Sequence, residues 1–211
     1  MITLIVEAVL GLLLVLFLMQ FFKRRPSVPS APQEPQQDLA NLQPTDARTG
    51  DVISIAGAGD NMTDLDFTVD RTTTVQAGSH NWTEISGPYR ERRVTMRVSN
   101  DEEIEVSLQN DPRKLTIEDL GVSEADLADM DERQNTSDYF EFDNRPWLYR
   151  LSREVQAKRD DQPRPVGYYY WEFREQDGRG ILAIRKPEGE PFAVALYTGI
   201  PTGDVTIYRR G

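Results

Sequence analysis

A run of mostly apolar residues at positions 2–22 restricts the structures that the chain can adopt more than any other feature. Its residues are almost all Ile, Leu, Val, Phe, Ala or Met, and Lys-Arg-Arg follows directly at positions 23–25. At about 1.5 Å per residue, a helix of this length spans roughly 30 Å, which matches the hydrocarbon core of a bilayer. Residues 1–25 are therefore predicted to be a single transmembrane anchor, whose helix ends at Pro26.

The basic residues after the run predict its orientation. Lys and Arg stay on the cytoplasmic side, so the N-terminus is expected outside and the remainder in the cytoplasm, at the cell inner membrane. The alternative is a cleaved signal peptide, but such a peptide carries its positive charge before the apolar run. Glu7 is costly in lipid, so it is expected to reach the outer interface, or else to mark a partner helix or a proton path.

Two further segments follow the anchor. Residues 26–49 contain five prolines and four glutamines with few apolar residues, which is typical of an unstructured linker. Residues 50–211 are expected to form one cytoplasmic domain, large enough to bury a core without disulfides.

Short runs of alternating apolar and polar residues, separated by turn residues, fill much of this domain. Residues 94–98 and 104–108 alternate on either side of a turn and predict a hairpin. Ser123 and Asp126 form a capping box for a helix over residues 123–130. The expected fold is mainly β, an antiparallel sandwich or open barrel with one short acidic helical segment. Further strands are predicted at residues 52–55, 65–69, 147–155, 168–173, 181–184, 192–197 and 205–208.

The residue content excludes several kinds of site. The absence of cysteine excludes disulfides and thiolate metal sites, and one histidine excludes the His-pair metal motifs. No dinucleotide, P-loop, calcium-loop or nucleophile-elbow motif is present, so no catalytic residue, metal ligand or cofactor is predicted. Thirty-five acidic residues against 24 basic ones give a net charge of −11, which argues against nucleic acid as a partner.

The negative charge is concentrated in one stretch. Residues 101–145 carry fifteen acidic and four basic residues, whereas the flanking parts of the domain are close to neutral. Such a field can attract a basic protein surface, a polyamine or a divalent cation. The alternative is a solvated face that keeps the domain soluble. The candidate binding residues here are Asp126, Asp129, Asp131 and Glu132.

An aromatic run, Tyr-Tyr-Tyr-Trp at residues 168–171, provides a second candidate surface. Strand alternation places Tyr169 and Trp171 on the face opposite to Tyr170, and one of the two faces must be core. The other face is a candidate surface for stacking or for docking a protein or ligand, and the alternative is a strand covered on both faces by a second sheet and a loop.

Several short motifs together resemble the bacterial domain-of-unknown-function family 4178. They are Gly50-Asp51-Val52, Asp66-Phe67-Thr68-Val69, Trp82-Thr83-Glu84, Tyr170-Trp171-Glu172-Phe173, Leu182-Ala183-Ile184 and Gly203-Asp204-Val205-Thr206-Ile207. The resemblance implies a small β-rich domain without an established activity, whose relatives occur near polyamine-synthesis and membrane-stress genes. No catalytic residue carries over from it, so function stays open. Trp82, Glu84 and Glu172, which stand within these motifs, complete the candidate binding residues.

These features lead to three hypotheses. The leading one is a membrane-tethered, non-enzymatic binding domain in an envelope-associated assembly, which recognises a protein, a small cationic ligand or a polyamine. The second is a hydrolase or transferase whose carboxylate site cannot be recognised in the sequence. The third is a structural subunit that acts through its transmembrane helix.

Overall fold

The computed structural model describes residues 42–209, so the predicted anchor and most of the predicted linker lie outside the described residues. Among residues 42–209, no helix combines the length and the apolar content that crossing a bilayer requires. The prediction of a mainly β fold is confirmed. The strands are β1 (Val52–Ile55), β2 (Leu65–Thr68), β3 (Arg71–Ala77), β4 (His80–Tyr89), β5 (Arg92–Asn100), β6 (Ile104–Gln109), β7 (Tyr139–Phe142), β8 (Arg145–Arg159), β9 (Val166–Glu175), β10 (Ile181–Pro187), β11 (Ala193–Ile200) and β12 (Val205–Tyr208).

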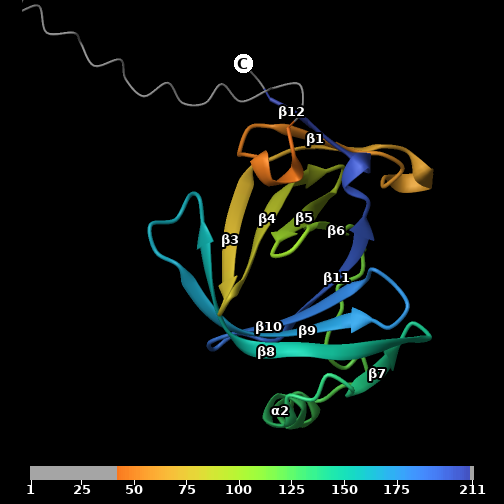
Figure 1. Cartoon of the computed structure of the whole chain (residues 1–211), viewed down its shortest axis with the longest axis vertical. Helices are drawn as coiled ribbons and strands as arrows, with labels where there is room; N and C mark the ends of the chain where they lie inside the picture. The colour runs from red at the N-terminus through yellow and green to blue at the C-terminus, as the bar shows by residue number, and fades with distance from the viewer. Residues whose placement is uncertain (1–41, 210–211) are drawn as a thin grey trace, which may run out of the picture. The chain divides into compact units, whose positions relative to one another are not determined.

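Eight antiparallel strands form a closed barrel, in the order β3-β4-β5-β6-β11-β10-β9-β8 (Figure 1). The sheet closes because β8 is 15 residues long and its two ends pair with different strands. Its first half pairs with β7, and its last residues pair with β3, where Val75 lies opposite Ala157. The barrel is therefore closed, not an open barrel or a sandwich. The expectation of an open sheet was wrong because it rested on strands that did not include β3 or β4.

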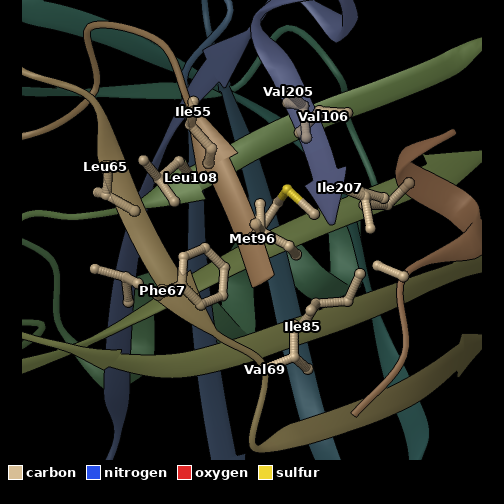
Figure 2. Close-up of a cluster of buried hydrophobic side chains, with 14 of the residues drawn as sticks. Ile55, Leu65, Phe67, Val69, Ile85, Met96, Val106, Leu108, Val205 and Ile207 are labelled. Carbon is tan, nitrogen blue, oxygen red and sulfur yellow. The ribbon is translucent and has the colours of Figure 1, made fainter. Parts of the chain in front are cut away.

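A small three-stranded sheet, β12-β1-β2, covers the outer face of β4, β5 and β6. Buried and less buried residues alternate along its strands, so Ile53 and Ile55 of β1 are fully buried while Val52 and Ser54 are half-buried. Figure 2 shows side chains of this sheet packing against Ile85, Met96 and Leu108 from the barrel. Burial of this apolar surface is the main stabilising contribution at this side of the barrel.

The helix α2 (Glu124–Arg133) and the loop before it cover the outer face of β8, β9 and β10. Ser123 caps this helix and forms the predicted capping box with Asp126, so the prediction of a short helix here is confirmed. Leu127 is fully buried on its inner face, against Trp171 and Phe173 of β9. Two parts of the outer barrel surface are thus apolar and covered: the part over β4, β5 and β6, and the part over β8, β9 and β10.

The packed structure also includes residues that the sequence places in the linker. Ala47 is buried and Leu42 packs against the same core as the small sheet. A 3-10 turn, η1 (Pro44–Asp46), lies between Leu42 and Ala47, and the backbone carbonyl of Asp46 accepts a 2.6 Å hydrogen bond from Arg209. Ordered packing therefore begins at least eight residues before position 50. Two more 3-10 turns are η2 (Asp60–Met62) and η3 (Thr202–Asp204).

Candidate functional site: the barrel interior and its acidic mouth

The interior of the barrel carries charged and aromatic side chains. Cross-strand register places Glu84 of β4 opposite Arg97 of β5, and Tyr170 of β9 opposite Arg185 of β10. Since neighbours in an antiparallel sheet point to the same face, these side chains meet inside the barrel. A smaller apolar group lies beside them, formed by Val75, Ala77, Val155, Ile181 and Ala183.

Glu172 is the centre of one buried network. Its carboxylate accepts a 2.8 Å hydrogen bond from Arg97, a 2.9 Å bond from the Tyr170 hydroxyl and a 2.9 Å bond from Arg174. Arg97 also donates to the Tyr170 hydroxyl at 2.8 Å. Burial opposes ionisation of Glu172, but the charges of Arg97 and Arg174 outweigh it and hold its pKa below the ordinary 4.5. The network keeps an ion pair in the barrel with its hydrogen bonds satisfied.

Glu84 is the centre of a second network. It accepts a 3.0 Å hydrogen bond from the indole N–H of Trp82 and a 2.5 Å bond from Arg185. The same guanidinium nitrogen donates to the Tyr197 hydroxyl at 3.0 Å. Burial is the main cause that raises the pKa of Tyr197, so this phenol stays protonated. Trp82 connects the two networks, because its ring lies 5.1 Å from that of Tyr170.

One end of the barrel opens into a cavity of about 440 Å³. We call this end the acidic mouth. Its wall is formed by Trp82, Arg97, Leu151, Glu172 and Arg174 of the interior. Its rim is formed by Asp101, Glu102 and Glu103 of the β5–β6 turn and by four strand residues of β4, β5, β6 and β8: His80, Ser99, Glu105 and Arg150. A neighbouring cavity of about 520 Å³ shares five lining residues with it: Arg97, Ser99, Glu103, Glu105 and Arg174.

Carboxylates outnumber guanidinium groups around the acidic mouth. Arg97 and Arg174 are paired with Glu172, and Arg174 lies 3.2 Å from Glu105 as well. Neither Glu102 nor Glu103 forms a hydrogen bond or an ion pair within residues 42–209. The lining has five carboxylates against three guanidinium groups, so it keeps two negative charges in excess, with His80 taken as neutral.

The acidic stretch does not form one surface. Residues 101–105 lie at the acidic mouth, whereas the acids of α2 lie on the outside of the barrel. Asp126 accepts hydrogen bonds from the Ser123 hydroxyl and backbone N–H, which lower its pKa. Asp131 accepts 2.8 Å and 2.9 Å bonds from Tyr169 and Gln134, and a further bond from Ser152. These two carboxylates hold the helix in place.

Asp129 and Glu132 differ from their neighbours on α2. Both are exposed, and neither makes a side-chain hydrogen bond or ion pair in the described part of the chain. They are therefore available to a partner, but they lie apart from Trp82, Glu84 and Glu172 in the interior.

The aromatic run lies as the alternation predicts, with Tyr170 inside the barrel and Tyr169 and Trp171 outside. The indole N–H of Trp171 donates a 3.1 Å hydrogen bond to the Leu127 carbonyl of α2, and its side chain is 7% exposed. Phe192 packs on it at 6.0 Å. The strand is thus covered on both faces, which was the alternative to a docking surface.

Several interior residues were not predicted as site residues, above all Arg97, Arg174, Arg185 and Tyr197. In the sequence they look like the solvated face of half-buried strands. One feature could have identified them: Glu172 stands within the most aromatic strand of the chain, where an unpaired carboxylate would be very unfavourable. A buried arginine partner is the usual solution.

The described residues contain no group of three or more His, Asp or Glu side chains arranged to hold a metal ion. Comparisons of the chain with models of known families, with curated proteins and with solved structures found no match.

Proposed function

We propose that this protein is a membrane-tethered, non-enzymatic binding domain whose acidic mouth takes a small cation of the diamine or polyamine class. The observation that supports this most is the excess of two carboxylates around an open cavity of about 440 Å³. A concave surface with an excess of one sign of charge concentrates counter-ions, because the protein wall focuses the field. The resemblance to domain-of-unknown-function family 4178 and the expected anchor are consistent with this role.

The charge distribution suggests how a polyamine would bind. Glu102 and Glu103 are the carboxylates at the rim without a protein partner among residues 42–209, so they are free to accept from an ammonium group. The interior provides little further negative charge, because Glu172 and Glu84 are already held by arginines. We therefore infer a ligand that spans the rim and does not fill the barrel.

The alternative, a carboxylate-based hydrolase or transferase, has less support. A general acid needs a raised pKa near the working pH, whereas Glu172 has a lowered one. Ionised and bonded to Arg97, Tyr170 and Arg174, it is also a weak base. A site of this kind would have to use the rim carboxylates, which lie in the same cavity as the proposed ligand.

The experiment is a titration of the full-length chain, in mild detergent, with spermidine by calorimetry. Replacing Glu102 and Glu103 together by Gln should raise the Kd about tenfold, since each exposed ion pair contributes up to about 1 kcal/mol. The matched control is Asp129→Asn with Glu132→Gln, which removes the same charge from exposed, unpaired positions on α2. An equal loss in both variants would show only a general charge effect and would contradict the site.

The tether is tested separately. If residues 2–22 form the proposed anchor, the full chain should remain in the membrane fraction after high salt and alkaline carbonate. A reporter fused to the C-terminus should be active in the cytoplasm. Activity only outside the cell, or a mature chain without residues 1–25, would contradict the proposed topology.

A further inference from the structure

The other end of the barrel has the opposite charge. The β4–β5, β8–β9 and β10–β11 turns lie at this end, whereas the β3–β4, β5–β6 and β9–β10 turns lie at the acidic mouth. A cavity of about 250 Å³ opens here, which we call the basic mouth. Four arginines line it, one each from β3, β5, β8 and β10: Arg71, Arg93, Arg159 and Arg185.

The basic mouth has one carboxylate in its lining, Glu84, which is already engaged by Trp82 and Arg185. Arg93 forms a two-bond pair with Asp70, at 2.6 and 2.7 Å, and this pairing is the main cause that lowers the pKa of Asp70. Arg159 forms a similar pair with Asp161, at 2.9 and 2.7 Å.

Arg71 is different from the other three arginines. It is half-buried at the start of β3, and its side chain makes no hydrogen bond or ion pair within residues 42–209. Arg71 is therefore the arginine of this lining whose guanidinium is not bonded to a carboxylate in the described structure, although its charge also helps to lower the pKa of the neighbouring Asp70. A planar guanidinium in this state is well suited to a phosphate or carboxylate group, which it can bind through two parallel hydrogen bonds.

Two buried polar atoms at the same cavity also lack a partner. They are Nε of Arg185 and the hydroxyl of Tyr168, and neither has a hydrogen-bond partner among the described residues. The two side chains are in contact, because the guanidinium carbon of Arg185 lies 5.7 Å from the centre of the Tyr168 ring. Buried polar groups are rarely left unsatisfied, so these atoms indicate a ligand.

We propose that the basic mouth is a second binding site, for a small ligand that carries a phosphate group. The phosphate would bind to Arg71 at the rim, and Arg185 Nε and the Tyr168 hydroxyl would donate to it from the wall. Neither donor competes with an existing bond, because both are unpartnered in the described structure. The small cavity favours a single phosphate group over a polynucleotide. This site is independent of the acidic mouth and does not rest on the function proposed there.

The test is calorimetry of the full-length chain in detergent, in phosphate-free buffer at constant ionic strength, with inorganic phosphate and with glycerol 3-phosphate as soluble probes. Nanodiscs with and without phosphatidic acid provide the lipid probe. Saturable binding of a soluble probe assigns the site to a soluble ligand, and binding of phosphatidic acid alone assigns it to a lipid headgroup. The absence of saturable binding for all three probes would overturn the proposal.

Two variants separate the site from a general charge effect. Arg71→Gln should raise the Kd about tenfold, which is the usual effect of losing one charged hydrogen bond. The matched control is Arg150→Gln, which removes an exposed, unpaired arginine at the acidic mouth and should leave the Kd unchanged. Tyr168→Phe should raise the Kd severalfold without lowering the melting temperature. Equal Kd values for wild type, Arg71→Gln and Tyr168→Phe would overturn the proposal.

Discussion

The guanidinium carbon of Arg97 lies over the indole ring of Trp82, 4.1 Å from the ring centre, while its two terminal nitrogens bond to Tyr170 and Glu172. One side chain thus connects the aromatic part of the barrel interior with its ion pair. Arg97 and Glu172 are 7% and 5% exposed at their side chains, so water contributes little to their solvation.

Arg97→Met is expected to be strongly destabilising, because it leaves Glu172 buried with less compensation. Breaking a buried pair costs about 3–5 kcal/mol of unfolding free energy. The double variant Arg97→Met with Glu172→Gln should be less destabilised than Arg97→Met alone, since the uncompensated charge is gone. Urea unfolding of the three proteins measures this, and a double variant that is less stable than Arg97→Met would contradict it.

Acid should weaken the domain through Glu172. Its pKa is below the ordinary 4.5 in the folded state, so the ion pair stabilises the fold above that pH. The contribution is lost as the pH falls from about 4.5 through the lower folded value. Glu172→Gln should be less stable than wild type at pH 7 and should lose less stability between pH 5 and 3. Thermal melts over this range provide the measurement, and parallel curves would argue against the assignment.

The acids of α2 should separate into two classes. Asp126→Asn is expected to cost about 1 kcal/mol, because it weakens the capping box with Ser123. Asp131→Asn should cost a similar amount, since three hydrogen bonds converge on that carboxylate. Asp129→Asn and Glu132→Gln should change stability by less than about 0.5 kcal/mol. Equal effects at all four positions would show that the contacts of Asp126 and Asp131 do not matter.

Gly87 is required by packing. A Cβ at this position would lie 2.1 Å from the Thr68 carbonyl oxygen of β2 and 2.7 Å from the Phe67 ring. Gly87→Ala should therefore push the small sheet away from β4 and cost about 3 kcal/mol or more. Gly203→Ala is the control, because its added methyl would meet nothing within 4 Å. Chemical denaturation distinguishes the two, and similar midpoints would contradict the prediction.

The first packed residues should also contribute measurably. A fragment of residues 42–211 is expected to fold without the anchor and to give a β-type circular dichroism spectrum with one cooperative melt. A fragment of residues 50–211 should be less stable by about 2 kcal/mol, because it lacks the Leu42 and Ala47 side chains that pack on the core. Identical melts would show that residues 42–49 are only a linker.

Alternation and capping made part of the fold predictable. The β5–β6 hairpin and the helix after Ser123 follow directly from local sequence, and both occur where they were expected. The strands β3 and β4 could not be recognised in the same way. β3 is rich in Thr, and β4 contains Gly87 and Pro88, which favour a turn. Here the close approach of Thr68 requires Gly87 within a strand.

The interior was harder to predict than the fold. Arg97 alternates with Val94, Met96 and Val98 as a solvated residue would. The position is buried only because the sheet closes on itself, and closure depends on the pairing of β3 with β8, whose paired residues are 80 to 86 positions apart in sequence. Sequence periodicity reports which face a residue occupies and cannot report that both faces are covered.

The pairing of β1 with β12 determines when, during synthesis, the small sheet can form. Val52, near the start of the domain, lies opposite Tyr208 near its end, and Arg209 forms a 3.0 Å ion pair with Asp51. The small sheet therefore cannot be completed until β12 has been synthesised and has left the ribosome. A chain that stops before β12 would leave Ile53 and Ile55 without two of their packing partners, Val205 and Ile207. Exposed apolar surface of this kind is recognised by chaperones and proteases, so a chain truncated before β12 is expected to be degraded.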